Sequence, residues 1–439
     1  MTLWITLGKI KNMYIKGSKF SMQRKRRRAN PFKVILLLLL IGALVYFDRM
    51  VVPTIPQFFQ PTSTPTRVPE SIISDARSLE AEGKYSLAIT SYKQAVAADP
   101  RNPENFMALA RLNIYTGNFE EAVTQAENAL LLNPNNDQAM ALRGYAIGLS
   151  GDYVRAVGAL EDAITINSNN AEAHAYLAEI YILMVQAGQG DLTTMDKAIS
   201  ESRIAETLAP GTLETHRARG VVLEYTSNYE EAAAEFEAAI AINPNIADLH
   251  LSLGRNYFYL QAYNDAITEY SKANALNPKD PTPETLISRA YAINGDYQKA
   301  IQYAEAALAD DPQDPYLYGN LGLVYSSATQ YLDAIDMLRV AVKGGVSADG
   351  ATVEGLPMAY GRVAQYYYTY GLALAREGQC SEALQISQAI ITGLRNDEVA
   401  VYNAEEIVNI CERLVREGNA DITLTAPPVE GSPTAEVTP

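Results

Sequence analysis

The sequence predicts an all-α protein in which short helix pairs stack into a solenoid. The stretch around Ala88, KYSLAITSYKQAVAADP, returns in related form around Ala122, Ala232, Ala266 and Ala300. A second alanine follows each of these by seven positions, and most copies lie 34 residues apart. This period holds two short helices and their turns but cannot bury an apolar core alone, so the copies must stack.

Nine copies can be aligned between residues 71 and 418, which we take as the solenoid. Their marker alanines are Ala88, Ala122, Ala156, Ala198, Ala232, Ala266, Ala300, Ala334 and Ala383. Large residues such as Phe236 follow the marker by four positions, and glycines such as Gly117 lie between the two helices. The pattern resembles the tetratricopeptide-repeat (TPR) family. That resemblance implies an α-solenoid of about nine TPR helix pairs, with the amphipathic segment from Asn396 as a C-terminal cap helix.

Two insertions interrupt the 34-residue period. One adds residues within 184–197, in the fourth copy, and the other within 343–357, before the ninth. Surface loops lengthen at little thermodynamic cost, so we expect both insertions to form loops.

A transmembrane helix is predicted before the repeats. Residues 1–31 form a basic segment that we expect in the cytoplasm, and residues 32–52 are apolar enough to span a bilayer if their few charges lie at the ends. A cleaved signal peptide is the alternative, but no pair of small residues marks a cleavage site. The basic asymmetry predicts a single-pass cell-membrane protein with its repeats outside the cytoplasm. We expect a Pro- and Thr-rich stalk at residues 53–70 and a disordered tail at residues 419–439.

The sequence favours neither nucleic-acid binding nor catalysis. Residues 34–439 carry 25 basic and 51 acidic residues, a net charge of −26, which repels nucleic acid. No nucleophile, phosphate-binding or metal motif is present, so we predict no enzyme activity, cofactor or metal. His174, His216 and His250 recur at one repeat position, but stacked helices hold such positions at least about 8 Å apart, too far for one zinc ion. We interpret them as packing residues.

The TPR resemblance implies a concave groove that binds a protein or peptide segment. Arg and Tyr recur at the positions that line this groove in the family, and both are frequent at binding hot spots. Ordinary structural arginines and solvent-facing tyrosines are the alternative interpretation. The predicted groove residues are Arg77, Arg111, Tyr115, Tyr145, Arg255, Phe258, Tyr259 and Arg289.

The function predicted is therefore a membrane-anchored TPR scaffold for protein–protein interaction. The alternatives are a structural or self-assembling component of the cell envelope and an accessory subunit of a membrane enzyme. The two cysteines, Cys380 and Cys411, lie at similar distances from a helix reversal near Arg395, so antiparallel packing would pair them as a disulfide. Two buried thiols are the alternative.

Overall fold

The computed structural model describes residues 30–46, 49 and 68–419, in two parts that are considered separately. In the first part, helix α1 covers Pro31–Tyr46, and its described side chains are exposed. Within the described residues no helix combines the length and the apolarity that a membrane crossing requires, and the predicted span 32–52 extends beyond α1. The rest of the predicted basic segment, most of the predicted stalk and nearly all of the predicted tail lie outside the described residues.

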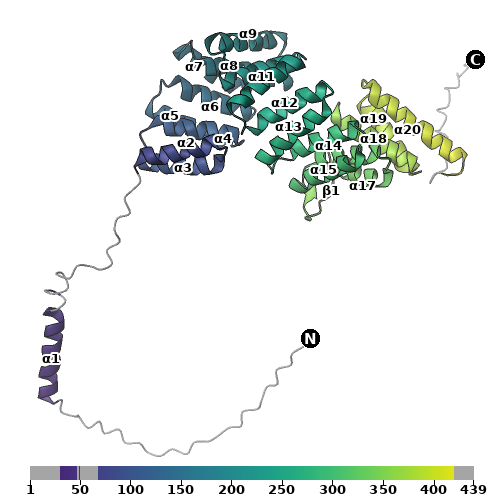
Figure 1. Cartoon of the computed structure of the whole chain (residues 1–439). Helices are drawn as coiled ribbons and strands as arrows, with labels where there is room; N and C mark the ends of the chain where they lie inside the picture. The colour runs from purple at the N-terminus through teal and green to yellow at the C-terminus, as the bar shows by residue number, and fades with distance from the viewer. Residues whose placement is uncertain (1–29, 47–48, 50–67, 420–439) are drawn as a thin grey trace, which may run out of the picture. The chain divides into compact units, whose positions relative to one another are not determined.

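Residues 68–419 form nine antiparallel helix pairs followed by one more helix (Figure 1). The first helices of the pairs are α2 (Pro69–Ala81), α4 (Pro103–Tyr115), α6 (Asp137–Leu149), α8 (Ala171–Gln186), α10 (Leu213–Tyr225), α12 (Ala247–Tyr259), α14 (Pro281–Ile293), α16 (Pro315–Ser327) and α18 (Arg362–Arg376). The second helices are α3 (Tyr85–Ala98), α5 (Phe119–Leu132), α7 (Tyr153–Ile166), α9 (Leu192–Leu208), α11 (Tyr229–Ile242), α13 (Tyr263–Leu276), α15 (Tyr297–Asp310), α17 (Tyr331–Lys343) and α19 (Cys380–Gly393). The predicted solenoid is confirmed.

In several pairs a glycine of the first helix faces a large residue of the second helix. A Cβ atom added to Gly254 would lie 2.5 Å from the ring of Tyr270, and one added to Gly322 would lie 2.5 Å from Leu338. Both large side chains are buried. The glycines therefore let the two helices approach until no space is left between them.

The turn inside a pair needs a residue with positive φ. Gly117 supplies it in the second pair, with φ of 74°. In the fifth, sixth and eighth pairs the same place is taken by Ser227, Gln261 and Thr329, with φ of 64°, 62° and 61°. Side chains rarely adopt this conformation, so these three turns carry local backbone strain.

The two insertions have different structures. The first is not a loop, as the sequence suggested, because most of it lengthens α8 and α9, and only residues 187–191 connect them. Asp191 and Thr194 cap the start of α9 reciprocally, which explains why the helix begins there. The second insertion forms a short hairpin of strands β1 (Gly345–Val346) and β2 (Thr352–Val353).

Helix α20 (Glu398–Arg416) lies across the last pair, in the place predicted for a cap helix. Its Ile407 is buried, and a Cβ atom on Gly371 of α18 would lie 2.4 Å from that side chain. Cys380 and Cys411 are both fully buried and joined as a disulfide, with their Cα atoms 5.5 Å apart. The disulfide therefore fastens the cap helix to the start of α19.

Candidate functional site

The predicted groove residues come from the same face of consecutive first helices. The ninth position of each repeat gives Arg77 on α2, Arg111 on α4 and Tyr145 on α6. The next residue in this series is an acid, Glu179 on α8, which is not among the predicted groove residues. The presence of an acid at the same repeat position as these arginines could have indicated that side chains of this face bond to one another.

A buried network surrounds Glu179. The Tyr145 hydroxyl donates to Glu179 Oε2 at 2.7 Å, and Arg217 Nε on α10 donates to Glu179 Oε1 at 2.9 Å. The Tyr145 ring stacks on Tyr176 at 4.1 Å between centroids, and the Arg217 guanidinium lies 4.9 Å from the Tyr145 ring centre. Burial raises the pKa of Glu179, while the Arg217 charge opposes that rise.

The network continues toward the N-terminal end of the solenoid. The Tyr176 hydroxyl donates to Glu172 Oε1 at 2.7 Å, and Arg111 Nη2 donates to the same oxygen at 3.3 Å. Tyr115 is half-buried beside this chain of contacts, and burial raises its pKa. Four first helices, from α4 to α10, are thus linked through alternating acids, arginines and tyrosines.

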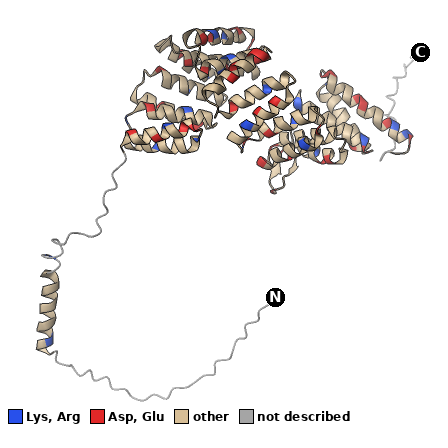
Figure 2. Ribbon diagram, in the orientation of Figure 1, with Lys and Arg blue, Asp and Glu red and all other residues tan. Residues whose placement is uncertain are grey.

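These contacts show that two of the predicted groove residues at the N-terminal end, Tyr145 and Arg111, are occupied by other side chains of the solenoid. Tyr145 is 3% exposed, so it lies beneath the surface of the groove and cannot contact a partner directly. Arg111 is paired with Glu172. Figure 2 shows acidic and basic residues interspersed along the helices from α2 to α20. The arginines of this part of the groove, Arg111 and Arg217, are each paired with a glutamate.

Arg77, the first of the predicted groove residues, is exposed and lines a hollow of about 530 Å³ together with Asn105 and Glu80. Glu80 accepts a hydrogen bond of 3.0 Å from the Tyr92 hydroxyl, and burial raises the pKa of Tyr92 to about 12. The hollow therefore combines the guanidinium groups of Arg77 and Arg111 with acids and amides and has no single charge preference.

At the C-terminal end, two of the predicted groove residues, Tyr259 and Arg289, are exposed. Arg289 on α14 is exposed, and its guanidinium lies 4.9 Å from the ring centre of Phe258 on α12. Tyr259 is 52% exposed and stacks on Tyr229 at 4.7 Å. Within the described residues no ion pair involves Arg289. We call Tyr229, Phe258, Tyr259 and Arg289 the Arg289 cluster.

Arg255 lies beside this cluster but is already bonded. Its Nε donates to Glu224 Oε1 at 2.9 Å, and its Nη2 donates to the Ser252 hydroxyl at 2.9 Å. The side chain connects α12 to α10, so its first role is to hold neighbouring pairs together. Among the predicted arginines of this end, Arg289 alone projects a guanidinium without a carboxylate partner in the described residues.

The three histidines form separate pairs, each within its own repeat. His174 Nδ1 lies 2.5 Å from Glu201 Oε2, and the corresponding distances are 2.6 Å for His216 with Glu235 and 2.7 Å for His250 with Glu269. Across the described parts of the chain, no group of three or more His, Cys, Asp or Glu side chains has the arrangement of a metal site. Each histidine links a first helix to its second helix.

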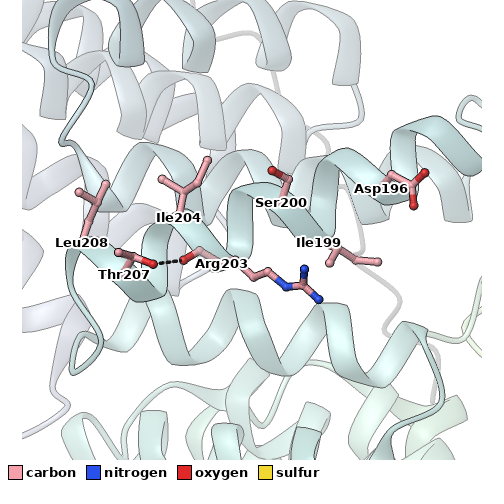
Figure 3. Close-up of a pocket in the computed structure, with 7 residues that line it drawn as sticks. All are labelled: Asp196, Ile199, Ser200, Arg203, Ile204, Thr207 and Leu208. Carbon is pink, nitrogen blue, oxygen red and sulfur yellow. Dashed lines mark hydrogen bonds between the residues drawn. The ribbon is translucent and has the colours of Figure 1, made fainter.

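A shallow hollow of about 560 Å³ lies along the outer face of α9 (Figure 3). Its lining includes Ile199, Ile204 and Leu208, and Arg203 extends from the same helix. The Thr207 hydroxyl donates to the Arg203 carbonyl at 2.9 Å, which is an internal helix contact. All of its lining residues come from one helix, and no convergent polar groups define a ligand there.

The fold and the pairing of small with large residues define a helical repeat protein of the solenoid class. Residues 79–144, 213–246 and 285–350 each match a family model described as a tetratricopeptide repeat. The chain therefore contains tetratricopeptide repeats in these three stretches of its solenoid, as the sequence pattern predicted. A search of the curated proteins gives no match.

Solved structures of similar fold have low sequence identity. One, from a functional characterization of Pseudomonas aeruginosa pilF, has 19% identity and a TM-score of 0.38, and the match covers 46% of this chain and 88% of that chain. A tetratricopeptide repeat protein from Parabacteroides merdae has 17% identity and a TM-score of 0.37, covering 58% of this chain and 98% of that chain. At these scores we transfer no property from either protein.

Proposed function

We propose that the chain is a binding scaffold whose partner docks on the Arg289 cluster. The observation that carries this proposal is an exposed guanidinium stacked on Phe258 and flanked by the half-exposed ring of Tyr259. Stacked aromatic rings present rigid contact area, and a free guanidinium can bind a carboxylate through two hydrogen bonds. An extended or helical segment with acidic and aromatic side chains fits this surface.

We further propose that α1 anchors the scaffold in a membrane, with the solenoid outside the cytoplasm. Apolar side chains from Val34 to Val45 are exposed, and none of them is buried by another described element. Lipid would cover this surface, and the basic residues that precede it favour a cytoplasmic N-terminus. A disulfide between Cys380 and Cys411 is in keeping with an oxidising compartment. Protease added to intact spheroplasts should digest the solenoid; digestion only after lysis would contradict the proposed orientation.

The scaffold proposal is tested with the full-length chain in mild detergent. Wild type, Arg289→Ala and Arg155→Ala are used to capture proteins from the native envelope, and the affinity for any captured protein is then measured. Arg155 is the matched control, an exposed arginine whose ion pair with Asp152 lies on the protein surface. We expect Arg289→Ala to weaken binding by about tenfold to thirtyfold and Arg155→Ala to leave it unchanged.

The melting temperature separates binding from folding. Arg289→Ala removes no ion pair among the described residues, so its melting temperature should match wild type, whereas Arg255→Ala breaks the contact with Glu224 and should lower it. Unchanged affinity in Arg289→Ala would overturn the proposed site. Capture of copies of this chain alone would favour the self-assembling envelope component, and capture of a membrane enzyme would identify the scaffold as its accessory subunit.

A further inference from the structure

The solenoid curls until its first pair touches the turn that leads into its sixth pair. The Tyr85 hydroxyl at the start of α3 donates to Asn243 Oδ1 at 3.1 Å, across 158 residues of sequence. Gly83, in the turn before α3, approaches Asn245 so closely that an added Cβ would lie 2.4 Å from Asn245 Cγ. Tyr85 is 8% exposed, so the hydroxyl that makes this contact belongs to a buried side chain.

The second pair extends the same contact. Tyr115 at the end of α4 lies 5.8 Å from the Tyr85 ring centre and packs against the cluster that contains Ile246 and Leu249 of the sixth pair. A cavity of about 250 Å³ lies between the α4–α5 turn and α12, and Arg217 is among its lining residues. The first two pairs therefore pack against the sixth pair beside the buried network of Glu179, and Tyr145 and Arg217 of that network line the cavity.

We propose that this contact is a lock that keeps the first turn of the solenoid closed. While it is closed, Tyr115 and Arg217 line a cavity of about 250 Å³. This volume is smaller than one turn of a helix, whose diameter with side chains is about 10–12 Å and whose pitch is about 5.4 Å. Opening separates the first pair from the α11–α12 turn and turns the cavity into a continuous groove. In the described residues the contact consists of one neutral hydrogen bond and van der Waals packing, so it can open without breaking an ion pair. The lock is distinct from the Arg289 cluster and does not depend on a partner there.

Two glycines of the same backbone geometry allow a controlled test. Gly83 and Gly117 occupy equivalent turns with φ of 73° and 74°, but an added Cβ meets Asn245 only at Gly83 and meets nothing within 4 Å at Gly117. Gly83→Ala and Gly117→Ala therefore share the strain of positive φ, and only Gly83→Ala pushes the lock apart. Tyr85→Phe is a milder variant that removes only the hydrogen bond.

Hydrogen exchange on the full-length protein measures how often this contact opens, and the measurement needs no ligand. We expect Gly83→Ala to raise exchange by on the order of tenfold at residues 84–92 and also at residues 240–250, while Gly117→Ala changes only its own turn. Tyr85→Phe should raise exchange at the same two segments by a smaller factor. Adding Asn245→Gly to Gly83→Ala should restore protection at residues 240–250. If residues 240–250 exchange alike in the two glycine variants and in Tyr85→Phe, the lock does not exist in solution.

Discussion

Replacing Glu179 by Gln tests whether charge pairing holds the inner face of the solenoid together. The substitution keeps the shape of the side chain and an acceptor for Tyr145 but removes the counter-charge of Arg217. The two paired side chains are only 7% and 5% exposed, so water cannot replace the lost carboxylate. Breaking a buried pair from one side costs about 3–5 kcal/mol.

A second pair in the same solenoid provides the comparison. Glu224 and Arg255 make an equally short contact of 2.9 Å, but their side chains are 16% and 37% exposed. Water can solvate Arg255 once Glu224 becomes Gln, so the cost should be about 1 kcal/mol or less. Replacing both Glu179 and Arg217 by Leu and Met should recover much of the loss, because no buried charge is left unpaired.

The assay is urea denaturation followed by circular dichroism, with the midpoint and the slope reported for each variant. Stacked repeats can unfold in stages, so a changed slope would show that one part of the solenoid has uncoupled from the rest. Glu179→Gln should lower the midpoint well below that of Glu224→Gln. Equal midpoints for these two variants would refute the reasoning that burial of the Glu179 network sets its importance.

Three further predictions concern single contacts. Burial disfavours the charged form of His174, but its hydrogen bond to Glu201 holds the pKa above the ordinary value, so the stabilisation is present below that ordinary pKa and is lost as pH rises through the folded-state pKa. Urea denaturation at about pH 5.5 and about pH 8.5 should therefore show a larger loss for His174→Gln at the lower pH; a loss independent of pH would contradict this. Thr329→Gly should stabilise by up to about 1 kcal/mol by relieving positive φ, while Thr329→Ala should not, and calorimetry compares them. Mass spectrometry after alkylation without reduction should find Cys380 and Cys411 unlabelled; two labelled thiols would exclude the disulfide in the native protein.

The repeating part of the fold could be read from the sequence because each repeat obeys local rules. Gly254 and Tyr270 lie 16 positions apart in the chain, and the spacing of small and large residues alone indicates that they face each other. The first insertion was predicted wrongly because Asp191 and Thr194 look like loop residues until their reciprocal capping of α9 is seen. Length alone does not distinguish a longer loop from two longer helices.

The candidate site was harder to predict because its contacts join different repeats. Arg111 and Tyr145 occupy repeat positions that line the groove in the family. Arg111 is nevertheless bonded to Glu172, two repeats further along, and Tyr145 is bonded to Glu179, one repeat further along. Arg289 has the same repeat position and no such partner in the described residues. Repeat position therefore predicts the face, whereas exposure depends on which side chains of other repeats pair with that position.

The contact between Tyr85 and Asn243 also sets an order of events during synthesis. Pairs that touch only their neighbours can form as soon as they emerge from the ribosome, from the N-terminus onward. Tyr85 must wait until the α11–α12 turn has been made, 158 residues later. In every newly made chain this contact is therefore open for the time needed to translate four further repeats, and Tyr115, which packs against the sixth pair in the finished solenoid, is accessible to a chaperone or a partner until then.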